Sequence, residues 1–217
     1  CAFMDQYDHK TVFSSIDFQG RYSYGNQPAT IHWNLIRFAE SLLPLIDKNE
    51  SKSIEIAQKT IDSFSEIFNE KWQIMMRSKL GLNDRSEEDE VLIKDLLTWM
   101  QSKKPDFTNT FCNLMHGNHA NDEEFEDTEF LVWKKNWQER INNNDYLNIM
   151  KKTNPILIPR NYLVEEALTE AETEGQFIKF KELLVILSKP YEQLEIDEKY
   201  SKTPEIQAEP YKTFCGT

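Results

Sequence analysis

The chain has 217 residues and a formal net charge of −12, with 37 acidic and 25 basic side chains. Its 39% hydrophobic and 12% aromatic residues exclude a disordered chain and suffice for the core of one domain or one large lobe. Because phosphate contacts need clustered Lys and Arg, the acidic balance argues against nucleic acid as the main partner, and equally against an anionic membrane.

The sequence has no apolar run near the roughly 20 residues of a membrane-spanning helix, and no secretory signal pattern. Its three cysteines, Cys1, Cys112 and Cys215, are too widely spaced to form a disulfide framework. Since such frameworks belong to oxidising compartments, we expect a cytoplasmic protein with neither nucleic-acid nor membrane partners.

The first predicted helix begins at Pro28, after an irregular segment over residues 1–27 that lacks helical spacing. Its apolar side chains fall on one stripe, widened by Trp33, so we expect a buried helix that ends at a turn over 47–50. Burial predicts that Trp33→Ala costs about 3–5 kcal/mol and Leu35→Ala about 2–5 kcal/mol. The stripe consists of Ile31, Leu35, Phe38, Leu42 and Leu45.

The remainder is also predicted to be helical, so the fold class is mostly α. Only 6 glycines and 8 prolines accompany many Glu, Lys, Leu and Ile residues, which favours helices over strands. We divide the chain into residues 1–27, a helical part over 28–190, and an extended C-terminal tail over 191–217 with Cys215. Further helices are predicted at 53–80, from 86 to just before Pro105, at 106–115, at 128–150 with a break at 142–144, at 160–174 and at 177–187.

One group of residues has the types and spacing of metal ligands at a helix end and the following loop. The alternative is a solvated loop, which we prefer because so few ligand types arise easily by chance. The acidic run over 122–129 is likewise better explained as solvated loop than as a site for a basic partner. The group comprises Cys112, His116, His119, Asp122, Glu123 and Glu124.

Several segments resemble one known family in the same order along the chain. GRYSYGNQP (20–28), followed by WNLIRFAESLLPLI (33–46), resembles the SelO (YdiU) family, pseudokinase-like enzymes that transfer AMP to proteins. Three further segments resemble the same family: FMDQYDHKTVFSSID (3–17), NPILIPRNYLVEEAL (154–168) and TFCGT (213–217). The resemblance is thin between about 50 and 150, where DFTNTF (106–111) and the region of Trp133 and Trp137 look familiar.

The resemblance implies the helical C-terminal lobe of a protein-kinase-like fold, with residues 1–27 as an activation-like segment. It implies that this chain is the C-terminal part of a longer protein. The ATP and Mg²⁺ sites of the family would then lie in a missing N-terminal nucleotide-binding part. We therefore assign no catalytic, cofactor-binding or metal-binding residue here, and we expect the chain alone to be inactive.

The resemblance also singles out a few residues. The family carries a cysteine or selenocysteine near its C-terminus, so Cys215 is a candidate redox residue with Cys1 as its candidate partner; the alternative is an unpaired exposed thiol. Asp17 and Arg21 would lie beside the active cleft, or they would form a buried ion pair that fixes the segment. For Arg160 to Tyr162, which match the family apart from Tyr162, we expect helix capping and packing.

The leading hypothesis for function is therefore part of a protein adenylyltransferase, which uses Mg·ATP to place AMP on Ser, Thr or Tyr hydroxyls of protein substrates. One alternative is a non-enzymatic all-α interaction module. Another is a kinase-like phosphotransferase of the same architecture. An upstream Lys/Glu pair and an Asp-Asn…Asp motif would favour the enzyme, and the mass added to a modified protein would separate AMP from phosphate.

Overall fold

A computed structural model describes residues 2–116, 123–141, 145–192 and 198–204, and in these ranges it contains helices without a β-strand. The prediction of a mostly α chain is confirmed. None of the described helices is long and apolar enough to cross a membrane. The helices are α1 (Gln27–Ile46), α2 (Glu50–Asp62), α3 (Phe64–Lys79), α4 (Glu88–Lys103), α5 (Phe107–His116), α6 (Thr128–Arg140), α7 (Tyr146–Thr153), α8 (Asn161–Glu174) and α9 (Ile178–Leu187), with short 3-10 turns η1 (Tyr24–Asn26), η2 (Glu123–Glu126) and η3 (Glu198–Tyr200).

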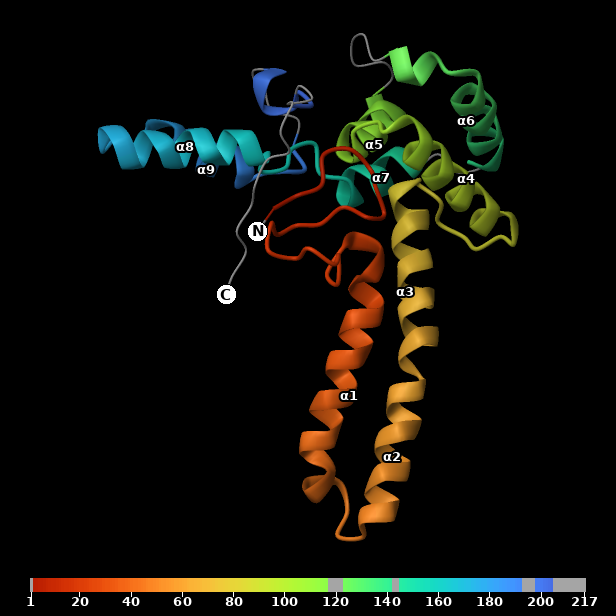
Figure 1. The fold of residues 1–217 in the computed structure, drawn as a ribbon. Helices are drawn as coiled ribbons and strands as arrows, with labels where there is room; N and C mark the ends of the chain where they lie inside the picture. Colours follow the sequence, from red (N-terminus) through yellow and green to blue (C-terminus); the bar gives the residue numbers. More distant parts are fainter. Residues whose placement is uncertain (1, 117–122, 142–144, 193–197, 205–217) are drawn as a thin grey trace.

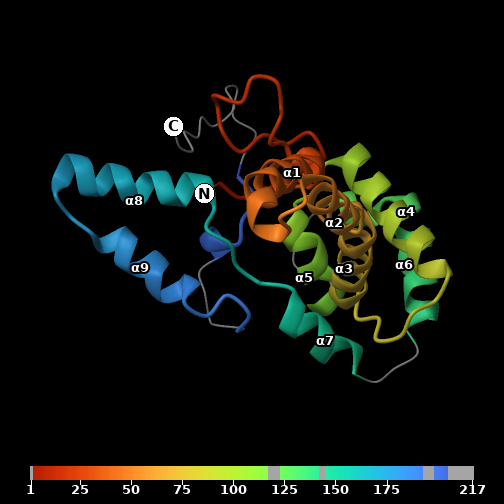
Figure 2. The same ribbon diagram turned by 90° about the horizontal axis from the view of Figure 1, so that it is seen from below.

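The described helices form a body with two projections (Figure 1). Helices α4 to α7 and the end of α3 make up the body, while α1 and α2 run antiparallel as a long hairpin that points away from it. A second hairpin, α8 and α9, projects sideways, and a view turned by 90° keeps the two hairpins apart (Figure 2). The segment before α1 lies where body and hairpins meet.

The long helix predicted over 53–80 is divided in two at Ser63. This residue keeps a helical backbone conformation, at φ −72° and ψ −13°, and serves as the C-cap of α2 and the N-cap of α3. Its hydroxyl donates to the carbonyl oxygen of Thr60 at 2.7 Å. Such back-bonding competes with the helical ladder and bends a helix. Hydrophobic periodicity continues through this division, which is why the sequence pattern does not reveal it.

A ladder of aromatic side chains holds the body together. The rings of Trp133 and Trp137 stack at 6.1 Å, and Phe130 packs between Trp133 and Trp99. Each of the two stacked tryptophans donates its indole N–H to a main-chain carbonyl, Trp133 to Leu92 at 2.8 Å and Trp137 to Leu80 at 2.9 Å. Burial of an aromatic ring whose N–H is satisfied is strongly stabilising, so this ladder is the centre of the core.

The turn after α3 depends on Gly81. Its φ of +74° lies in the left-handed region, and a Cβ added there would come within 2.9 Å of the Tyr146 carbonyl oxygen. Glycine both avoids the backbone strain and lets α7 approach the end of α3. Gly175, with φ +65°, follows the end of α8 in the same way, so the predicted helix ends near 80 and 174 are confirmed.

The prediction that the helix after Pro28 is a buried pillar is wrong for this chain. In α1 only Thr30 is buried, while Trp33, Phe38 and Leu45 are 47%, 60% and 82% exposed. Helix α1 has apolar residues on several sides, and it packs mainly against α2. One apolar side of α1 therefore remains uncovered. Periodicity reported the apolar stripe correctly, but it does not reveal whether a neighbour covers it.

Candidate functional site

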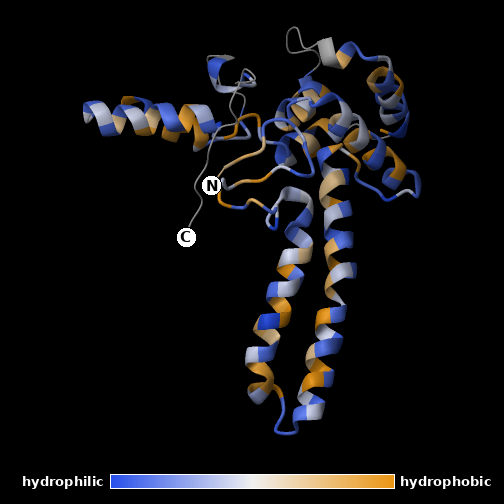
Figure 3. Ribbon diagram, viewed as in Figure 1, coloured by the Kyte–Doolittle hydropathy of each residue, from blue (hydrophilic) through white to orange (hydrophobic). Residues whose placement is uncertain are grey.

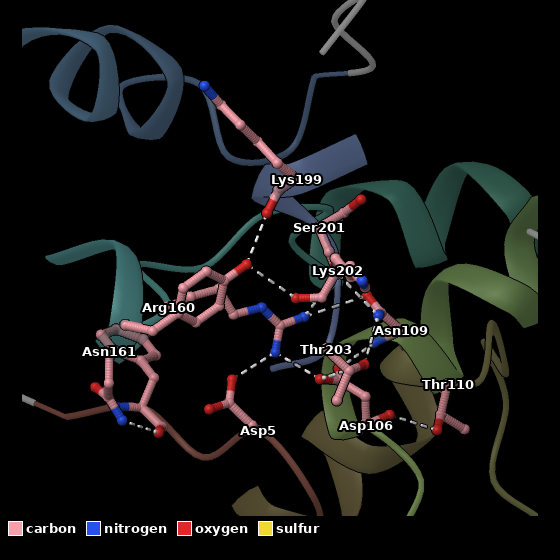
Figure 4. A network of polar contacts seen from close by, with 12 residues as sticks. Asp5, Asp106, Asn109, Thr110, Arg160, Asn161, Lys199, Ser201, Lys202 and Thr203 are labelled. Carbon is pink, nitrogen blue, oxygen red and sulfur yellow. Dashed lines mark hydrogen bonds and ion pairs between the residues drawn. The ribbon is translucent and has the colours of Figure 1, made fainter. Parts of the chain in front are cut away.

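A network of polar contacts is centred on Arg160, which is 1% exposed and directly precedes α8. Its Nη1 donates to Asp5 Oδ1 at 2.6 Å and to Asp106 Oδ2 at 2.5 Å. Figure 4 shows the guanidinium group pointing between these two carboxylates. Arg160 therefore ties the segment before α1 to the start of α5 and of α8.

Asp106 also caps α5. One of its carboxylate oxygens accepts the backbone N–H of Asn109 at 2.8 Å, as the side chain of an N-cap residue does. The Asn109 side chain in turn donates to the Ser201 carbonyl oxygen at 3.0 Å, and Thr203 donates to Asp106 at 3.3 Å. The network shown in Figure 4 thus reaches the 198–204 segment as well.

Burial governs the electrostatics of this network. Removal from water raises the pKa of Asp5, and the nearby Arg160 offsets only part of that rise. For Arg160, burial acts to lower the pKa of the guanidinium, but Asp106 and Asp5 outweigh it and raise that pKa. Arg160 stays charged, and its loss would leave the buried Asp106 and the partly buried Asp5 without their cation. The expected role in capping and packing is replaced by that of a buried ion-pair centre.

Asp17 and Arg21, the predicted cleft-facing pair, do not form an ion pair with each other. The Asp17 carboxylate instead accepts two backbone N–H groups, from Arg21 at 2.9 Å and from Tyr22 at 2.8 Å. This arrangement fixes the turn that leads into α1. The alternative of a buried Arg–carboxylate pair is therefore wrong, since Arg21 is exposed and forms no ion pair with any carboxylate in the described part of the chain.

The Arg21 guanidinium group is held by aromatic rings. It lies 4.6 Å from the centre of the Trp33 ring and 5.7 Å from that of Tyr22. Arg37 also lies over Trp33, at 5.6 Å, and pairs with Glu40 at 2.7 Å. Stacking orients a guanidinium group without neutralising it, so Arg21 remains available to an anion.

Sequence patterns did not single out Lys79, which lines a cavity of about 350 Å³ beside the segment before α1. Its Nζ donates to Asn154 Oδ1 at 3.0 Å and lies 4.4 Å from the ring centre of Phe111. Burial lowers the pKa of Lys79 from 10.5 to about 8. No carboxylate among the described residues pairs with this ammonium group.

Replacing Lys79 by methionine is expected to stabilise the protein in a pH-dependent way. The folded-state pKa lies below that of the unfolded chain, so the folded state carries the cost of the buried charge at every pH below about 8. That cost is at most roughly 3 kcal/mol, and it disappears as the pH rises past the ordinary value because Lys79 is then neutral in both states. Lys79→Met should raise the free energy of unfolding at neutral pH, and the gain should shrink towards about pH 10.

Urea unfolding of the two proteins at both pH values measures this gain, because other titrating groups are common to both and cancel in the difference. A gain that does not change with pH, or a Lys79→Met protein less stable at both values, would contradict the assignment.

The residues proposed as metal ligands, where the structure describes them, do not support a metal site. Cys112 lies on a buried face of α5, where its thiol donates to the Pro155 carbonyl oxygen at 3.7 Å. Burial raises the pKa of Cys112 to about 12, which disfavours the thiolate that binds metals. Within the described ranges, no three His, Cys, Asp or Glu residues are placed to share an ion. Cys1, His119, Asp122 and Cys215 lie outside these ranges.

A hollow of about 1130 Å³ lies between α4 and α6. Arg140 forms a buried ion pair at its edge, donating from Nε to Asp89 Oδ1 at 2.8 Å. Carboxylates predominate among the charged groups of the wall, which does not suit a polyphosphate. They are Asp84, Glu88, Asp95, Glu129 and Glu139.

Comparison with known proteins identifies the relatives of this chain. A family model described as protein adenylyltransferase SelO matches residues 1–188. The chain is 48% identical to a protein nucleotidyltransferase YdiU of Clostridium botulinum (strain Eklund 17B / Type B), over 222 aligned positions. Proteins of the same name from Anoxybacillus flavithermus and Nitrosococcus oceani are 48% and 45% identical.

Each of these alignments covers 100% of the chain but 45% of the relative, so the chain spans about half the length of the curated relatives that it matches. The residues matched by the family model include Asp5, Asp106 and Arg160 of the network, together with Asp17, Arg21 and Lys79. Because the SelO family model matches most of the length of this chain, the chain belongs to the SelO family.

Proposed function

We propose that the chain is the helical lobe of a protein adenylyltransferase that moves AMP from ATP to Ser, Thr or Tyr hydroxyls of other proteins. The observation that carries the proposal is the SelO family match over residues 1–188. It is supported by relatives named protein nucleotidyltransferases, which align with the whole chain. In this proposal the lobe belongs to a kinase-like fold, and residues 1–27 are its activation-like segment.

Nucleotidyl transfer of this kind depends on Mg²⁺ and on cationic groups that neutralise phosphate charge. The described residues do not fit the metal, since no three possible ligands among them converge. We therefore propose that Mg²⁺ and ATP bind in an N-terminal part outside this chain, and we assign no step through them to this chain.

The contribution of this chain, in the proposal, is to position one wall of the cleft. The Arg160–Asp5 ion pair anchors the start of the activation-like segment to the helical body. The Asp17 turn then presents the Arg21 cation on the Trp33 ring, where it could meet a phosphate group or an acidic residue of a substrate. Arg21 is thus proposed as a residue that faces the cleft.

The test uses a chimera in which this chain replaces the matched 45% of the C. botulinum relative. Purified chimera is incubated with Mg·ATP and a mixture of bacterial proteins, and the products are analysed by mass spectrometry. AMP-sized additions on Ser, Thr or Tyr support the proposal. Phosphate-sized additions would show a kinase instead, and the absence of either, with the unaltered relative active beside it, would favour the interaction module.

A further inference from the structure

The stripe predicted from the sequence is present on α1 but lacks a covering element. Ile31, Phe38 and Leu45 follow one another at intervals of seven residues, which places them on one side of the helix. They are 46%, 60% and 82% exposed, and half-buried Leu35 and Leu42 lie between them. We call these five residues the α1 stripe. Figure 3 shows the hydrophobic bands along the projecting hairpin.

The α1 stripe differs from ordinary scattered surface hydrophobics. A surface helix normally turns its one apolar side towards a core, and large contiguous apolar patches mark sites of association. Helix α1 already packs against α2, and Ile36 and Leu43, which lie on another side of α1 from Ile31, Phe38 and Leu45, are half-buried. It therefore has an apolar side beyond the one that its neighbour covers.

The length of the relatives indicates what covers the stripe. They carry more than half of their residues outside the matched 45%, and the match with this chain includes all of α1. A second copy is a poorer occupant, because two chains of net charge −12 repel each other. We propose that the α1 stripe is the docking surface for the N-terminal part of the SelO polypeptide. The inference rests on the proposed function for the identity of that part.

The test compares one substitution in two settings. Phe38→Asp places a charge in the middle of the stripe, and its effect on the thermal midpoint is measured in the isolated chain and in the chimera. If the stripe is covered, the midpoint of the chimera falls by at least about 5 °C while that of the isolated chain hardly changes. Leu184→Asp on α9 is the matched control, because Leu184 is also 60% exposed, and it should be tolerated in both.

Equal small effects of Phe38→Asp in the two settings would overturn the proposal. So would a concentration-dependent dimer of the isolated chain that Phe38→Asp disperses, since the occupant would then be a second copy. Because the readout is stability, a chimera that transfers no AMP still tests the surface. If the chimera does not fold, the N-terminal part is co-expressed with the chain and its capture by the chain is measured. Capture that Phe38→Asp reduces about tenfold supports docking. Absent or unchanged capture overturns it.

Discussion

Replacing Arg160 by methionine is expected to lower the free energy of unfolding by about 3–5 kcal/mol, because it leaves the buried Asp106 and the partly buried Asp5 without their cation. Asp106 is 5% exposed and cannot recover its hydration, while Asp5 loses its 2.6 Å ion pair. The loss should also release the segment before α1 from the body. Urea unfolding, followed by far-UV circular dichroism, measures the free energy.

Two further variants separate the ion pair from simple packing. Arg160→Lys keeps the charge but not the planar fork, so a smaller loss than that of Arg160→Met is expected. Asp5→Asn keeps the shape, and it should cost less than Arg160→Met because Asp106 retains the cation. A loss of less than about 1 kcal/mol for Arg160→Met would contradict the central place of this network.

Truncation of Trp137 to alanine is expected to cost about 3–5 kcal/mol, whereas truncation of Trp33 should cost no more than about 1 kcal/mol in this chain. Trp137 is 3% exposed, stacks on Trp133 and donates to the Leu80 carbonyl oxygen. Trp33 is 47% exposed and loses mainly its contacts with Arg21 and Arg37. The expectation of a large loss at Trp33 is thereby reversed.

Trp137→Ala and Trp33→Ala remove identical atoms, so each variant is the control for the other. Chemical unfolding of both variants gives the comparison directly. A loss at Trp33 that equals the loss at Trp137 would mean that α1 is covered in the isolated chain, and would also contradict an open α1 stripe.

Helices and their ends were largely predictable because the signals are local. Asp106 before α5 and Gly175 after α8 act within one turn of the chain, so their residue types alone indicate the boundary. The division at Ser63 was missed because it does not interrupt the apolar period.

Features that depend on distant residues were not predictable. Arg160 meets a carboxylate 155 residues earlier in the chain, and no spacing rule connects them. Lys79 is one of many lysines, and its lowered pKa comes from burial among residues that are distant in the sequence, such as Phe111 and Asn154. Family resemblance marked the segments around Asp5, Asp106 and Arg160, but only their folded arrangement revealed the ion pairs.

Calorimetric titration of Mg·ATP, into the 217-residue chain and separately into the chimera, tests most directly whether the nucleotide site needs residues beyond this chain. We expect binding heat from the chimera and none from the chain alone, because the described residues converge on no metal site and the hollow between α4 and α6 has mainly acidic walls. Binding of Mg·ATP by the isolated chain would contradict a split site. Binding by neither protein would contradict the adenylyltransferase and leave the interaction module.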